Sequence, residues 1–73
     1  MEKDKFLIQL GLRIRQIRKQ KGMTQEHLSG ACNIEKANLS RIESGATNPT
    51  VLTLHKICNA CGVNVAELFI LIE

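Results

Sequence analysis

Apolar side chains recur every three or four residues in several separate stretches of the chain, and this spacing places them on one face of a helix. The first stretch has four such positions, which are Leu7, Leu10, Ile14 and Ile17. It ends at Gly22, which can adopt the left-handed conformation of a helix cap. The pattern therefore predicts a helix over about residues 5–21, with an apolar inner face and a basic outer face.

Two short helices are predicted next, over about residues 25–32 and 36–43, with a tight turn between them. Thr24 can cap the first of these helices with its hydroxyl group, and Asn33 tolerates the left-handed backbone that a sharp turn needs. The apolar stripe of the first short helix consists of Leu28, Ala31 and Cys32. Helix, turn and helix thus follow one another within twenty residues.

The second short helix has two distinct faces. Leu39 and Ile42 are three residues apart and should both point toward the core. The opposite face then carries short or basic side chains, namely Lys36, Ala37, Ser40 and Arg41. Such a face suits the major groove of DNA, because small residues let the backbone approach while cations reach guanine or phosphate oxygens. A solvated helix face is the alternative that this pattern leaves open.

A loop over residues 44–49 follows, because Pro49 disfavours helix at the residue before it. Thr50 can then cap a fourth helix over about residues 51–61. The inner positions of this helix are Leu54, Ile57, Cys58 and Cys61.

The last predicted helix covers about residues 65–72 and contains five consecutive apolar residues, Leu68, Phe69, Ile70, Leu71 and Ile72. A helix with 3.6 residues per turn cannot turn all five toward one core. We therefore expect a homodimer that uses these five residues as its interface, to which Phe6 and Ile8 could contribute. The alternative is a tail that packs back on the first helix.

Together these segments predict an all-α fold, a compact five-helix domain with a helix-turn-helix that spans residues 1–73 as a single domain. A chain of this size buries only about 60% of the surface that it exposes when unfolded, so its core must be efficient or completed by a partner. A deep catalytic cleft is not expected, and the chain is not expected to be an enzyme.

The net charge of +3 is unevenly distributed along the chain. Residues 1–21 hold seven of the ten cations and two of the acids, a local balance of +5 that would attract a polyanionic partner. No apolar run approaches the roughly 20 residues that span a bilayer, and Phe6-Leu7-Ile8 is too short for a signal peptide. We expect no membrane association and a cytoplasmic, nucleoid-associated protein.

Several short motifs follow one another along most of the chain. They include Leu10-Gly11, Ile17-Arg18-Lys19, Lys21-Gly22-Met23-Thr24-Gln25, Leu39-Ser40-Arg41-Ile42-Glu43, Asn48-Pro49-Thr50 and Glu67-Leu68-Phe69. In order and spacing they resemble the helix-turn-helix family of phage repressors and Cro proteins, also called the XRE family. The resemblance implies a lambda-repressor-like fold and a transcriptional regulator that binds double-stranded DNA, with a palindromic operator bound by a dimer.

Phage repressors, antitoxins and controllers of restriction-modification genes share this compact form, and the short tail is closest to the controllers. The alternative function is a protein-interaction module, or an antitoxin-type component, that uses the same fold to bind a partner protein. Steep weakening of binding with rising salt would separate DNA binding from this alternative.

The resemblance also implies roles for individual residues. Contacts to bases fall on Lys36, Ala37, Asn38, Ser40 and Arg41. Contacts to phosphates fall on Gln25, Ser44, Thr47 and Asn48. Family members usually carry other residues in place of Ala37 and Glu35, and Glu35 puts a negative charge near the phosphates.

Arg18 and Glu43 lie where the first and third helices should meet, each next to a core isoleucine. In the resembled family the matching positions form a partly buried ion pair that ties the recognition helix to the first helix. An exposed pair is the alternative, and it would be worth at most about 1 kcal/mol.

A thiol or metal site is the rival interpretation. Cys58-x-x-Cys61 has redox or zinc spacing, and Cys32, His27 and His55 are conceivable further ligands. The pair lies at the carboxyl end of a helix, however, where the dipole disfavours a thiolate, and its positions also belong to the apolar stripe. We therefore expect buried structural cysteines and exposed histidines, with no metal, cofactor or small-molecule ligand.

Overall fold

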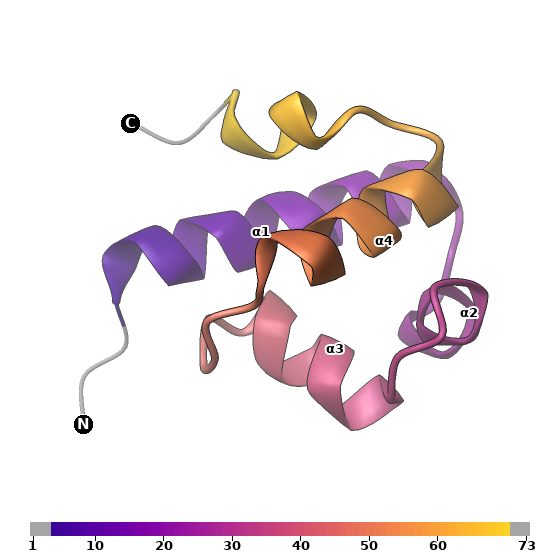
Figure 1. Cartoon of the computed structure of the whole chain (residues 1–73), viewed down its shortest axis with the longest axis horizontal. Coiled ribbons are helices and arrows are strands. Elements are labelled where there is room, and N and C mark those ends of the chain that lie inside the picture. Colours follow the sequence, from indigo (N-terminus) through magenta and orange to yellow (C-terminus); the bar gives the residue numbers. More distant parts are fainter. Residues whose placement is uncertain (1–3, 71–73) are drawn as a thin grey trace.

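The computed structural model describes residues 4–70, and all regular elements within that range are helical. Four of them are α-helices, and these are α1 (Lys5–Gln20), α2 (Gln25–Ala31), α3 (Lys36–Glu43) and α4 (Val51–Cys61). A short 3₁₀-helix, η1 (Val65–Phe69), follows α4 (Figure 1). The prediction of an all-α fold is confirmed, and the first four helices lie within a residue of their predicted bounds.

The fifth predicted helix is wrong in type and length. In place of an α-helix over residues 65–72 the chain forms η1, which ends at Phe69. The side chain of Asn64 caps η1 by accepting a hydrogen bond from the amide of Ala66, at 2.9 Å. Two of the predicted interface residues, Leu71 and Ile72, lie outside the described residues.

The helix boundaries follow from local chemistry that the sequence displays. The hydroxyl oxygen of Thr24 accepts a hydrogen bond from the amide of His27, at 3.0 Å, and Thr50 caps α4 in the same way. Asn33 adopts the left-handed conformation with φ of 60°, which makes the sharp turn between α2 and α3. Both caps and the turn agree with prediction, and together they fix the angle at which α3 leaves α2.

In Figure 1, α3 and η1 lie on opposite sides of the long helix α1, and α3 also packs against α2. A single apolar cluster fills the space between the elements. Its most deeply buried members are Ile14, Leu28, Leu39, Ile42, Ile57, Cys58 and Leu68. The predicted inner stripe of α2 needs one correction, because Ala31 at the end of that helix is exposed.

Gly11 allows α1 and α3 to approach closely. A Cβ atom at this position would lie 2.5 Å from the carbonyl oxygen of Glu43, which is too short for a real contact. The residue must therefore be glycine if the backbones of the two helices are to meet. This close approach sets the depth at which α3 sits on α1.

Arg13 anchors η1 to α1. Its Nε donates a hydrogen bond to the carbonyl oxygen of Glu67 at 2.8 Å, and its Nη2 lies 3.8 Å from the carboxylate of the same residue. The rings of Phe6 and Phe69 stack nearby, with centroids 6.3 Å apart. The segment thus packs back on the first helix, as the alternative to an interface helix required.

This packing changes the predicted dimer interface. Leu68 points into the core and is only 1% exposed, so it is not available to a second chain. Phe69 and Ile70, by contrast, remain 41% and 64% exposed. A 3₁₀-helix brings residues three apart onto one edge, and here it turns a single apolar residue inward.

Candidate nucleic-acid interface

Helix α3 presents a polar face to solvent and an apolar face to the core. Leu39 and Ile42 are almost completely buried, and they hold the helix against α1 and α2. The side chains exposed on the other face are Lys36, Ala37, Ser40 and Arg41, while Asn38 is half-buried. Four of the five residues predicted to contact bases therefore share one accessible surface, and Asn38 lies at its edge.

Arg18 and Glu43 form a buried ion pair between α1 and the end of α3. The Nε of Arg18 lies 2.7 Å from Oε2 of Glu43, and Nη2 donates to Oε1 at 3.1 Å. The remaining Nη1 donates to the carbonyl oxygen of Met23 at 2.8 Å. The side chains are 8% and 2% exposed, so the exposed alternative does not apply. The pair joins α3 to α1 and to the loop that precedes α2.

Gln25 takes part in the same network, which the sequence did not indicate. Its Nε2 donates a hydrogen bond to Oε1 of Glu43 at 3.0 Å. The carboxylate of Glu43 therefore receives two bonds from Arg18 and one from the first residue of α2. This arrangement fixes the position of α2 relative to α3, and it restricts the side chain of Gln25 to one orientation.

The loop after α3 carries the remaining predicted phosphate contacts. The Oγ of Ser44 donates to the carbonyl oxygen of Arg41 at 3.0 Å, Thr47 is half-buried, and Asn48 is exposed. Gly45 in this loop has φ of 77°, and a Cβ atom there would lie 2.7 Å from the Cα of Ile8. The loop is thus held against α1, next to the carboxyl end of α3.

The cysteines are buried within the core. Burial raises the pKa of the Cys58 thiol from 9.0 to about 11, and it also raises the pKa values of Cys61 and Cys32. A thiol that holds its proton this strongly is a poor nucleophile and a poor metal ligand. His27 and His55 are exposed on the surfaces of α2 and α4, as predicted.

Within residues 4–70, none of the helices has the length and apolar character needed to cross a bilayer. 

Comparison with known proteins places these features in a wider group. The family described as helix-turn-helix matches residues 14–68, which includes α2, α3, α4 and most of α1. One curated relative is an uncharacterized HTH-type transcriptional regulator, y4dJ, of Sinorhizobium fredii. It is 37% identical over 59 residues, which cover 81% of this chain and 77% of the relative. Other curated relatives are longer, and the chain spans 43%, 41% and 30% of the length of three of them.

Two solved structures share the fold closely. The restriction-modification controller protein C.AhdI from Aeromonas hydrophila superposes with a TM-score of 0.85 and 28% identity, covering 86% of this chain and 96% of that one. SinR, a master regulator for biofilm formation solved in complex with DNA, superposes with a TM-score of 0.78 and 36% identity. That superposition covers 82% of this chain and 97% of the SinR chain.

Proposed function

We propose that this chain, which belongs to the helix-turn-helix family of the XRE type, is a transcriptional regulator that reads a specific sequence of double-stranded DNA through α3. The observation that carries the proposal is the division of α3 into a buried apolar face and an exposed polar one. A helix fits the major groove, and the groove edge of each base pair offers a distinct pattern of donors and acceptors.

The exposed face of α3 has the side chains that such recognition requires. Lys36 and Arg41 can donate to O6 and N7 of guanine, Ser40 can pair with several bases, and Ala37 can contact a thymine methyl group. Asn38, at the edge of this face, can reach either a base or a phosphate. These five residues are the base contacts that we propose.

Contacts to phosphates hold the helix in register without reading sequence. We assign this role to Gln25, Ser44, Thr47 and Asn48, which lie at the start of α2 and in the loop after α3. The hydrogen bond from Gln25 to Glu43 supports the assignment, because a side chain with a fixed orientation loses less entropy when it binds. The likeness to SinR, a regulator solved with DNA, agrees with this mode of binding.

We further propose that the regulator binds a palindromic operator as a homodimer. The support is an exposed apolar patch formed by Phe6, Phe69 and Ile70, which would be costly to leave in water on so small a protein. Two-fold symmetry would place two α3 helices in successive major grooves, about 34 Å apart. Leu68 has no place in this interface because it is buried within one chain.

A regulator of this kind would act without enzymatic activity or a small-molecule ligand, at the nucleoid in the cytoplasm. The experiment that tests the proposal is selection of bound fragments from random duplex DNA, followed by fluorescence anisotropy at increasing salt. An enriched inverted repeat, bound with affinity that falls steeply as salt rises, is the expected result. Binding that prefers no sequence would contradict a regulatory role, and failure to bind any duplex at low salt would favour the alternative of a protein-interaction module.

A further inference from the structure

Helix α1 has an unusual balance of charge. Its sixteen residues include five cations and no acid. Two of the cations have acidic partners, since Arg18 pairs with Glu43 and Arg13 with Glu67. Within the part of the chain that the structure describes, Lys5, Arg15 and Lys19 are exposed and have no ion pair.

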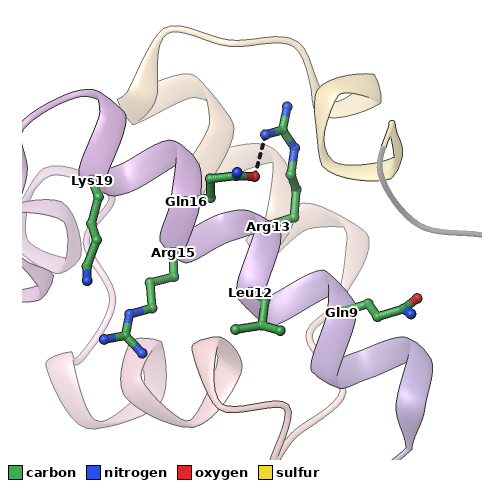
Figure 2. Close-up of a pocket in the computed structure, with 6 residues that line it drawn as sticks. All are labelled: Gln9, Leu12, Arg13, Arg15, Gln16 and Lys19. Carbon is green, nitrogen blue, oxygen red and sulfur yellow. Dashed lines mark hydrogen bonds between the residues drawn. The ribbon is translucent and has the colours of Figure 1, made fainter.

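Two of these unpaired cations lie on the same side of α1. Arg15 and Lys19 are four residues apart, so they are neighbours along the helix surface. Figure 2 shows that both leave α1 on one side, whereas Arg13 and Gln16, which are hydrogen-bonded to each other, leave it on the other. The second side faces η1 through Arg13 and Glu67. Arg15 and Lys19 therefore do not help to hold the protein's own elements together.

Lys19 also lines an open hollow that reaches the recognition helix. The hollow lies between the end of α1, the start of α2 and the start of α3, and its lining includes Lys19, Thr24, Gln25, Glu26 and Lys36. Lys36 and Glu26 are both exposed and would balance each other in charge. Lys19 makes the exposed charge of the hollow positive, on the wall opposite Lys36.

From these positions we infer that Lys19, with Arg15 one turn before it, binds backbone phosphates of the duplex whose groove α3 enters. The inference rests on the proposed function. A strand that passes the hollow between α1 and α3 meets Lys36 and Gln25 on one side and Lys19 on the other, and Arg15 extends the positive row along α1. These contacts strengthen binding to every sequence alike, because phosphates carry no sequence information.

The experiment measures binding of the duplex selected from random DNA as a function of salt concentration. We compare the wild-type chain with Lys19→Ala, Arg15→Ala and the control Lys5→Ala, which removes the same charge from the other end of α1. The distance along the helix from Lys5 to Lys19 is about 21 Å. Melting curves verify that these exposed substitutions leave the fold intact.

We expect Lys19→Ala and Arg15→Ala each to make the log–log salt slope shallower by about 0.9, with the preference for the selected duplex over random duplex unchanged. Lys5→Ala should leave the slope as it is, and Lys19→Arg should restore it. A slope for Lys19→Ala equal to that of the wild type, or an equal change in Lys5→Ala, would overturn the inference while the proposed function stood. If the wild-type chain bound no duplex, the proposed function itself would fail.

Discussion

Gln25 and Glu43 are eighteen residues apart in sequence and are joined by a hydrogen bond of 3.0 Å between Nε2 and Oε1. The same carboxylate receives two hydrogen bonds from Arg18. One buried acid therefore connects α1, the start of α2 and the end of α3. The rigidity of the helix-turn-helix depends on that carboxylate, since the parts that must present a surface to DNA all meet there.

Glu43→Ala should strongly destabilise the fold. The substitution leaves the buried guanidinium of Arg18 without its partner, which costs about 3–5 kcal/mol of unfolding free energy. Urea denaturation followed by circular dichroism measures the loss. The matched control is Glu67→Ala, because Glu67 is 45% exposed in its pair with Arg13 and should cost at most about 1 kcal/mol. Equal losses in the two variants would show that the buried pair has no special weight.

Lys36→Ala and Arg41→Ala should each weaken binding to the selected duplex by about 1–3 kcal/mol and relax the preference at one position of the site. Both side chains are exposed on α3, so neither change should alter the melting temperature much. Anisotropy titrations with a set of single-base variants of the duplex measure the effect. A loss of affinity that was the same for every base variant would show that these residues do not read the sequence.

Gln25→Ala should weaken binding to all sequences alike, because its proposed partner is a phosphate. The variant also loses one hydrogen bond to Glu43, so a small decrease in stability is expected as well. The ratio of affinities for the selected and random duplexes is the informative quantity. It should stay constant, and a decrease in that ratio would move Gln25 from the phosphate contacts to the base contacts.

Ile70→Glu should convert the proposed dimer to a monomer. Ile70 is 64% exposed beside Phe69, so a charge there opposes association without entering the core. Light scattering of the purified protein gives the mass. Leu12→Glu is the control, since Leu12 is 54% exposed on the outer face of α1 and outside the patch. A mass unchanged by Ile70→Glu would reject this patch as the interface.

The free energy of unfolding should decrease as the pH rises from 9.0 toward about 11. The pKa of the Cys58 thiol is raised to about 11 in the folded chain, so the unfolded chain loses this proton at a lower pH and is favoured in that range. Cys58→Ala removes this contribution, and its stability should decline less steeply over the same range. Parallel declines in denaturation experiments would show that the folded and unfolded thiols titrate alike.

Features set by neighbouring residues could be predicted from the sequence. The caps at Thr24 and Thr50 and the left-handed turn at Asn33 depend on residues within four positions, and all of them were predicted. The inward faces of α1, α3 and α4 follow from helical spacing alone. These elements are enough to expose the predicted face of α3.

Features that depend on distant segments could not be predicted in this way. The hydrogen bond from Arg13 to Glu67 joins residues 54 positions apart, and it holds the last segment against α1. Five consecutive apolar residues favoured a longer helix with an exposed face, but that packing buries Leu68. The bond from Gln25 to Glu43 was missed for the same reason, because nothing in local spacing indicates that the two side chains meet.

The most direct test of a DNA-reading α3 is a titration of the isotope-labelled protein with the selected duplex, followed by amide chemical shifts. We expect the largest changes at Lys36, Ala37, Ser40 and Arg41 on the exposed face of α3. Changes confined to α4 and η1, with the amides of α3 unmoved at saturation, would contradict the account.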